Sequence, residues 1–228
     1  LAVRNLRKSY RKRPVIRDVS MDLDRGEVVA QLGPNGSGKT TCFYCIAGLV
    51  APDSGTVTLL GNVAFDDSGA HADAYRTARH GIGAVFQHPE DQIVTTITED
   101  DVAFGPENLA IAHDDIDMRI AMSLDAVDMS GQREADPTRM SGGQQQRVAI
   151  AGMLAMNPEI LVLDEPTAML DPQGRADIMH ILDELQQHGT TIILVTHHRD
   201  EFVNADRIIR LDNGRIVQSA HGDTASIP

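Results

Sequence analysis

The sequence predicts an α/β fold in which a core of alternating strands and helices is interrupted by a block of helices. Short apolar runs typical of buried parallel strands occur near both ends of the chain, for example at 28–32 and 160–163. By contrast, the segment from about Glu99 to Met156 has a helical pattern only. A length of 228 residues fits one large domain or two small ones, and we expect one.

The first part of the chain is expected to form strands around one helix. Val19, Met21 and Leu23 alternate with polar residues, which indicates a half-buried strand. A short buried strand at 27–32 runs into a glycine-rich segment, after which we expect a helix from about Gly38 to Leu49. Further strands are predicted at 56–60 and 82–86.

The remaining elements follow in order. Helices are predicted at 114–127 and 141–156, followed by a buried strand at 160–163. Asp171 and Pro172 are typical of a helix start, and Gly189 of its end. A buried strand at 191–195 comes next. Strands at 208–211 and 215–217 flank a hairpin turn at 212–214.

Composition excludes several classes of protein. The net charge of −13 disfavours non-specific binding to nucleic acid or to anionic lipid. Two cysteines argue against a disulfide scaffold and fit a reducing cytosol. No apolar run approaches the roughly 18 residues that a membrane span needs, and no secretory signal pattern occurs at the start. We expect a cytoplasmic protein with a core of aliphatic residues.

The strongest motif is a phosphate-binding loop of the form G-x-x-x-x-G-K-[ST]. It follows a predicted strand and precedes a helix, which is the context that the motif requires. Backbone N–H groups and the helix N-terminus would hold phosphates, Lys39 would contact the β- and γ-phosphates, and the Thr40 hydroxyl would bind Mg²⁺. A plain glycine-rich turn is the alternative. The predicted nucleotide-binding residues are Gly33, Pro34, Asn35, Gly36, Ser37, Gly38, Lys39, Thr40 and Thr41.

Two carboxylates end the buried strand at 160–163, where α/β proteins bind ligands. Asp164 would hold Mg²⁺ directly or through water, and Glu165 would orient and polarise an attacking water. An apolar strand that ends in Asp-Glu is common by itself. Its occurrence together with the phosphate loop is what predicts ATP hydrolysis.

A second helix start with an anion-binding pattern lies about 100 residues from the first. Ser141 would cap the helix, while Gly142 and Gly143 expose its first N–H groups, and Gln144 follows. One nucleotide rarely needs two such helix starts, whereas two copies arranged head to tail would use both. The alternative is an ordinary helix cap that happens to be followed by two flexible glycines and binds no anion.

These motifs resemble the nucleotide-binding domain of ABC transporters, in the same order and over nearly the whole chain. The resemblance implies that Tyr10 stacks on adenine, that Gln87 contacts Mg²⁺ or water and couples to a membrane subunit, and that His197 senses the γ-phosphate. Ser141–Gln144 match the family signature, although Met140 stands where leucine is usual. The loop that ends at Asp171 would contact the opposite subunit.

The resemblance also implies an architecture and a set of cofactors. We expect a P-loop NTPase (RecA-like) core over residues 1–86 and 159–228, with an antiparallel β subdomain, and an inserted α-helical subdomain over 87–158. ATP and Mg²⁺ would be the cofactors. The implied metal ligands are Thr40, Gln87 and Asp164; the implied catalytic residues are Glu165, His197, Gln87 and Lys39.

Three segments are similar to the ATPases of energy-coupling factor (ECF) importers, namely 86–92, 99–109 and 167–172. Those importers take up vitamins or transition-metal ions and pair two ATPases with a scaffold membrane protein and a substrate-binding membrane protein. The resemblance therefore implies a motor subunit on the inner face of the cell membrane. Its partners would be those two membrane subunits and a second ABC ATPase, either a copy of this chain or a paralogue, with no nucleic acid.

Other interpretations remain at this point. The chain could serve another class of ABC transporter, a soluble nucleic-acid-linked ABC ATPase, or an assembly module that binds ATP without turnover. Cys42 and Cys45 have C-x-x-C spacing, but without further cysteines we expect buried core thiols and not a metal site. His198 is expected to be solvated or a reserve contact. The acidic run at 99–101 is expected to complement a helix dipole, with a coupling role as the alternative.

Overall fold

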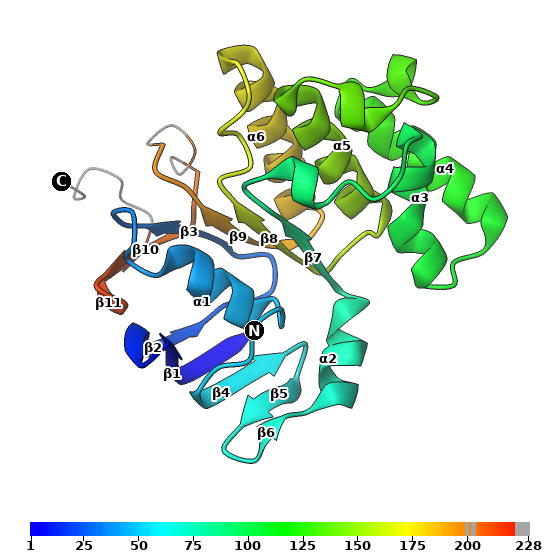
Figure 1. The fold of residues 1–228 in the computed structure, drawn as a ribbon. Coiled ribbons are helices and arrows are strands. Elements are labelled where there is room, and N and C mark those ends of the chain that lie inside the picture. Colours follow the sequence, from blue (N-terminus) through cyan, green and yellow to red (C-terminus); the bar gives the residue numbers. More distant parts are fainter. Residues whose placement is uncertain (199–200, 202–203, 222–228) are drawn as a thin grey trace.

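Two β-sheets and two groups of helices make up the molecule (Figure 1). The computed structural model describes residues 1–198, 201 and 204–221. Within these residues, six strands form one sheet in the order β11-β10-β3-β9-β8-β7, and five form another in the order β2-β1-β4-β5-β6. Mixed parallel and antiparallel pairing with an inserted helical block is the fold class that the sequence predicts.

The six-stranded sheet carries the functional loops. Neighbouring strands from β10 to β7 are parallel, and only β11 pairs antiparallel to its neighbour. The carboxyl ends of the parallel strands therefore meet at one edge, as α/β ligand sites require. The strands are β3 (Val28–Leu32), β7 (Ile82–Val85), β8 (Ile160–Asp164), β9 (Thr191–Val195), β10 (Arg207–Asp212) and β11 (Arg215–His221).

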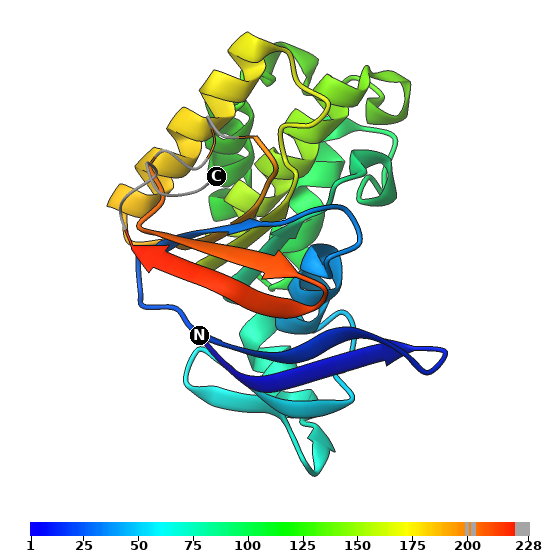
Figure 2. The same cartoon turned by 90° about the vertical axis from the view of Figure 1, so that its left-hand side faces the viewer.

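The five-stranded antiparallel sheet packs below the first, with α1 (Lys39–Ile46) between them (Figures 1 and 2). Phe43 of α1 is fully buried in a core formed by apolar side chains from both sheets. A short helix, α2 (Ala72–Arg79), follows this sheet. Its strands are β1 (Ala2–Tyr10), β2 (Arg13–Asp22), β4 (Ser54–Leu59), β5 (Asn62–Asp66) and β6 (Gly69–Ala70).

The other helices form a second core on the opposite side of the six-stranded sheet. Helices α3 (Thr98–Asn108) and α4 (His113–Ala126) pack on α5 (Gly142–Ala155), while α6 (Pro172–Gln187) packs on β9. Single 3₁₀ turns occur at Pro89–Asp91, Ser130–Gln132 and Pro137–Arg139. None of the helices in the described part of the chain has the length and apolarity of a membrane span.

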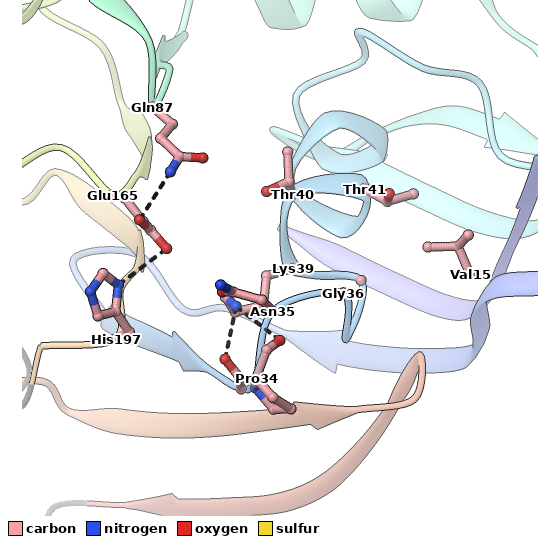
Figure 3. A pocket seen from close by; sticks show the side chains of 12 residues that line it. Val15, Pro34, Asn35, Gly36, Lys39, Thr40, Thr41, Gln87, Glu165 and His197 are labelled. Carbon is pink, nitrogen blue, oxygen red and sulfur yellow. Dashed lines mark hydrogen bonds and ion pairs between the residues drawn. The ribbon is translucent and has the colours of Figure 1, made fainter. Parts of the chain in front are cut away.

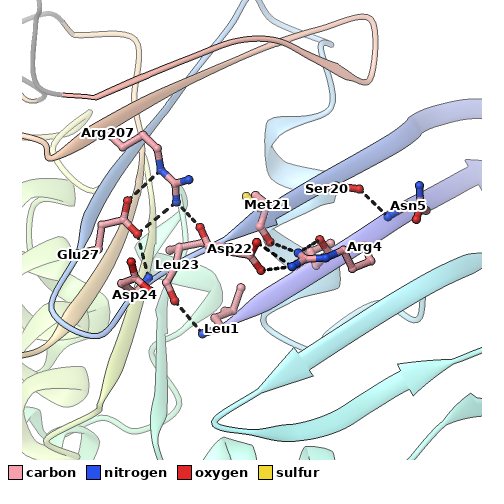
Figure 4. Close-up of polar contacts among 11 residues, drawn as sticks. Leu1, Arg4, Asn5, Ser20, Met21, Asp22, Leu23, Asp24, Glu27 and Arg207 are labelled. Carbon is pink, nitrogen blue, oxygen red and sulfur yellow. Dashed lines mark hydrogen bonds and ion pairs between the residues drawn. The ribbon is translucent and has the colours of Figure 1, made fainter.

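Polar contacts join the two sheets at the start of β3 (Figure 4). The Nε of Arg207 on β10 lies 2.8 Å from Oε1 of Glu27, and the same guanidinium donates to the carbonyl of Asp22 at the end of β2. The amino terminus of Leu1 donates to the carbonyl of Leu23 at 3.0 Å. These contacts lie at the opposite end of β3 from the glycine-rich loop.

Most predicted elements occur, with shifted ends. The predicted strand at 191–195 matches β9, while the helix expected from Gly38 to Leu49 ends at Ile46. The cause is Gly48, whose φ of +73° is incompatible with a continuing helix. Strands β1, β5 and β6 and helix α2 were not predicted from the sequence. The division into residues 1–86, 87–158 and 159–228 stays a prediction.

Candidate functional site

The glycine-rich loop joins the end of β3 to the start of α1. Gly38 caps α1 in the left-handed region, with φ of +105°, which a residue with a side chain rarely adopts. Lys39 is 7% exposed, and its ammonium donates to the carbonyls of Gly33 and Pro34 at 2.8 and 3.3 Å. The loop thus curls around its own lysine, which lies ready to exchange these carbonyls for phosphate oxygens.

A cavity of about 520 Å³ opens above this loop (Figure 3). It brings residues from the loop together with side chains that follow β7, β8 and β9, as predicted from the sequence. The lining residues are Val15, Gly33, Pro34, Asn35, Gly36, Gly38, Lys39, Thr40, Thr41, Gln87, Glu165 and His197. Ser37 belongs to the same loop but does not line the cavity, because it is buried.

Glu165 lies at the centre of the polar wall of the cavity. Gln87 donates from Nε2 to Oε2 of Glu165 at 3.2 Å, and Nδ1 of His197 lies 3.2 Å from Oε1 of the same carboxylate (Figure 3). The backbone of Glu165 has φ of +48°, a strained conformation for a residue other than glycine. Both carboxylate oxygens are therefore held from opposite sides, which fixes where an attacking water could be bound.

Asp164 precedes Glu165 and is 2% exposed. Burial raises the pKa of its carboxyl above the ordinary 3.8, an effect that the Thr40 hydroxyl partly offsets. The Asp164 carboxylate is hydrogen-bonded to the Thr40 hydroxyl, and Gln87 lines the same cavity as Thr40, so each of the three side chains can offer an oxygen atom, the ligand that Mg²⁺ prefers. The residues present therefore fit a magnesium ion held by Thr40, Asp164 and Gln87.

A second cavity, of about 440 Å³, lies at the start of α5. Ser141 and Gln144 form a reciprocal cap there: Gln144 N donates to the serine hydroxyl at 3.4 Å, and Ser141 N donates to the glutamine carbonyl at 3.1 Å. A side chain on Gly143 would approach the Met169 carbonyl to 3.2 Å. Its lining residues are Ser141, Gly142, Gly143, Gln144, Arg147, Met169, Leu170 and Asp171.

The two cavities share no lining residue. One copy of the chain therefore presents the loop around Lys39 and the start of α5 as separate surfaces. Asp171 caps α6, accepting from Gly174 N at 2.7 Å, and faces the second cavity. Tyr10, at the end of β1, is 45% exposed and lines neither cavity, so its contact with adenine stays a prediction.

Two supports of the loop were not predicted from the sequence. Val15 on β2 lines the cavity, and its carbonyl would lie 3.1 Å from a side chain on Gly38. Gly214, in the β10–β11 turn, donates to the Ser37 carbonyl at 2.8 Å, and its own carbonyl accepts from Arg17 at 2.7 Å. The turn residues were predicted, but contacts between distant elements carry no local sequence signal.

Comparison with known sequences gives consistent results. A family described as ABC transporter matches residues 16–168. An ABC transporter ATP-binding protein of Bifidobacterium longum is 61% identical over 92% of this chain and 26% of that protein. The energy-coupling factor transporter ATP-binding protein EcfA1 of Clostridium novyi is 47% identical over 88% of this chain and 70% of that protein. The energy-coupling factor transporter ATP-binding protein EcfA2 of Methanospirillum hungatei is 42% identical over 93% of this chain and 52% of that protein. The chain thus spans about a quarter of the Bifidobacterium longum protein and about half of the Methanospirillum hungatei protein.

Solved structures share the fold. CbiO1 of Clostridium perfringens, described as part of the ABC transporter complex CbiONQ, has a TM-score of 0.83 and 34% identity over 97% of this chain and 88% of its own. The ATP-binding cassette MJ0796, solved as a dimer in a post-hydrolysis state bound to ADP and phosphate, has a TM-score of 0.88 and 29% identity over 97% of this chain and 98% of its own.

Proposed function

Because this chain belongs to the ABC transporter family of ATP-binding domains, we propose that it is the ATP-hydrolysing motor of an ECF-type importer. The observation that carries the proposal is the position of Glu165 above the phosphate loop, held between Gln87 and His197. Hydrolysis needs a positioned water and neutralised phosphate charge more than covalent chemistry. The cavity supplies groups for both.

The residues of the cavity have distinct tasks in this proposal. Lys39 transfers its hydrogen bonds from the Gly33 and Pro34 carbonyls to the β- and γ-phosphates. Bound Mg²⁺ supplies charge neutralisation at the phosphates. Glu165 orients the attacking water and accepts its proton, while His197 contacts the γ-phosphate.

A complete catalytic site takes two chains. The start of α5 presents N–H groups to a second cavity that is separate from the loop around Lys39. In a head-to-tail pair, Ser141, Gly143 and the Asp171 loop of one chain close over the ATP held by the other. Hydrolysis is thereby tied to closure of the pair, since neither surface is complete alone. The second chain is a copy of this one or a paralogue.

A groove beside the Gln87 loop is suited to a membrane partner. It has a volume of about 390 Å³ and is bordered by α2, α3, α5 and the segment at 92–94. Phe104 and Val94 line it and are 50% and 58% exposed, which is unusual for large apolar side chains. Gln92 accepts from Phe86 N at 2.7 Å and donates to the Ala84 carbonyl at 2.9 Å, so the groove is tied to β7 and the Gln87 loop.

In the proposed complex, a helix of the transmembrane scaffold subunit lies in this groove. Closure of the ATPase pair moves α3 to α5 and pulls on that helix through the Gln87 loop. A separate substrate-binding membrane subunit selects the cargo, a vitamin or a transition-metal ion. The chain is accordingly placed on the cytoplasmic face of the membrane.

The test is to tag the protein in its native host, solubilise the membranes gently and identify the proteins that co-purify. A scaffold protein with a small substrate-binding membrane protein is expected, together with Mg²⁺-dependent ATPase activity. Recovery of a substrate-binding lipoprotein with paired permeases would assign another importer class. Recovery of no membrane protein, with ATPase activity intact, would contradict the importer proposal.

Two matched variants test the docking groove in the same experiment. Phe104→Asp should release the scaffold subunit and leave ATP affinity unchanged, because it places a charge in the apolar groove away from the phosphate loop. Met122→Asp on α4 is the control, since Met122 is 66% exposed and lies outside the groove. Equal recovery of the scaffold with both variants would contradict this docking site.

A further inference from the structure

Glu201 is a buried carboxylate that the proposed mechanism does not use. Its side chain has no exposed surface, although carboxylates are almost never fully buried unless they are paired. One oxygen accepts from the Thr167 hydroxyl and the other from the Thr196 hydroxyl, and both threonines are fully buried. Nε of Arg175 lies 3.9 Å from the oxygen that Thr167 contacts. The carboxylate is thus enclosed by partners from three separate segments.

The two threonines belong to the loops that carry the catalytic pair. Thr167 lies two residues after Glu165, and Thr196 directly precedes His197. Regular pairing of β8 with β9 ends at Asp164 and Val195, and a last backbone hydrogen bond of 2.8 Å joins Glu165 N to the Val195 carbonyl. Beyond that point the two loops are joined side chain to side chain, and Glu201 makes the buried link between them.

The same cluster holds the His197 loop from its other side. His198 N donates to the Thr196 hydroxyl at 3.0 Å, and Arg175 donates to Nδ1 of His198 at 3.2 Å. The rings of His197 and His198 lie 4.1 Å apart, centroid to centroid. Because arginine can only donate, His198 accepts at Nδ1, which fixes its ring plane beside His197. His198 is therefore partly exposed and held by Arg175 beside His197.

We propose that Glu201 is a positioning residue that holds His197 at hydrogen-bonding distance from Glu165 by bridging Thr167 and Thr196. This inference rests on the proposed ATP hydrolysis, in which the water position depends on the Glu165 carboxylate. Arg175 lies one turn after Asp171 on α6, so the cluster also joins the His197 loop to the loop that faces the second chain. Closure of the pair can then reach the water position through Arg175 and the buried carboxylate of Glu201.

Three variants, assayed in the complex purified from native membranes, separate this role from a purely structural one. Glu201→Gln keeps the shape but replaces one acceptor by a donor. Thr196→Val removes the link from Glu201 to the His197 loop, together with the hydroxyl that accepts from His198 N. Each should lower kcat about tenfold, as small displacements of catalytic groups do, and change KM for ATP less than about twofold. Glu27→Gln is the control, because it breaks the ion pair with Arg207 at the far end of β3 and should lower Tm without changing kcat.

Combination with His197→Ala gives the decisive readout. If Glu201 acts through His197, Glu201→Gln should lower kcat less than about twofold in the His197→Ala background, so that the two effects do not multiply. Multiplicative effects, or a normal kcat for both Glu201→Gln and Thr196→Val, would overturn the positioning role. If the wild type hydrolyses ATP and Glu165→Gln does not, the proposed ATP hydrolysis stands whatever this cycle shows. Absence of wild-type hydrolysis would overturn both.

Discussion

At the scale of single residues, burial and strain concentrate where strand β8 ends. Glu165 adopts a left-handed backbone conformation with φ of +48°, and Asp164 before it is a buried acid with a raised pKa. Both features are costs to folding that recur at functional sites. The site is therefore expected to gain stability when it loses function.

Asp164→Asn tests this trade-off. A raised folded-state pKa favours the folded protein below the ordinary 3.8 and disfavours it once the pH exceeds the folded value, so at neutral pH the ionised Asp164 destabilises the nucleotide-free protein. The variant should raise Tm at pH 7 by about 2 to 4 °C for each kcal/mol relieved and abolish Mg²⁺-dependent hydrolysis. The Tm difference between variant and wild type should shrink as the pH falls through the raised folded-state pKa of Asp164 and should be lost below pH 3.8, where the acid is largely protonated in both states.

Asp177→Asn on α6 is the control, because the pKa of Asp177 is lowered in the folded protein whereas that of Asp164 is raised. Hydrogen bonds from Gln173 and then Arg147 lower the pKa of Asp177, so its ionised form favours the folded state above pH 3.8 and loses that contribution as the pH falls. Tm at pH 7 should therefore fall or stay constant with ATPase activity retained. A lower Tm for Asp164→Asn than for the wild type at pH 7 would contradict the account of the buried acid.

Every residue that lines the cavity around Lys39 except Val15 was singled out from the sequence, but the contacts among them could not be predicted. Lys39, Thr40, Asp164 and Glu165 belong to local motifs, each of which is defined by a strand and the residues directly after it. Glu201 has no such motif, because its partners come from segments that are 5 and 34 positions away. Tyr10 was chosen by resemblance alone, and its position at the end of β1 outside both cavities leaves that role a prediction.

At the scale of elements, glycines allow loops to approach one another closely. Gly33, with φ of +152°, is one of the two tightest cases, since a side chain there would lie 2.2 Å from the Leu211 carbonyl of β10; the other is Gly214, at 2.0 Å from the Val15 carbonyl. Gly143 allows the start of α5 to lie against the Met169 carbonyl. The glycine pattern predicted a phosphate loop, whereas the support of that loop by β10 and the β10–β11 turn depends on the three-dimensional sheet order.

Gly33→Ala should lower the free energy of unfolding by about 3 kcal/mol or more, because the loop and β10 must separate. Gly69→Ala is the matched control: it also has a positive φ, of +108°, but a side chain there meets nothing within 4 Å. Its expected cost is only about 1 to 2 kcal/mol, that of the left-handed backbone. Urea unfolding of the two variants measures the difference. Similar losses for both would show that the contact with β10 is unimportant.

Element types were predictable where the pattern was local and strong. The apolar runs of β3, β8 and β9 and the caps of α5 and α6 identified these elements in the sequence. Strands β1, β5 and β6 lie in the antiparallel sheet, where pairing with neighbours and not an apolar run defines the strand. Register shifts along β1 weaken its alternation further, which explains why the sequence pattern missed it.

At the scale of the whole molecule, our proposal treats the two cavities as halves of one nucleotide site on separate surfaces of the chain. The cavity around Lys39 holds the glycine-rich loop and the side chains to which we assign hydrolysis, while Ser141 and Asp171 face the other cavity. The two cavities share no lining residue within one chain. Closure of two chains satisfies both surfaces and accounts for the apolar Met169, which is 48% exposed beside Ser141 and Gly142.

The most direct test of this composite site is the mass of the Glu165→Gln protein, measured by light scattering with and without ATP and Mg²⁺. The sample includes any second ATPase subunit that co-purifies with the protein. ATP should convert single chains into a stable pair, because the site binds the nucleotide but turnover is blocked. Adding Ser141→Arg should restore single chains while ATP binding persists. A mass that is unchanged by saturating ATP, or a pair that survives Ser141→Arg, would contradict a site built from two chains.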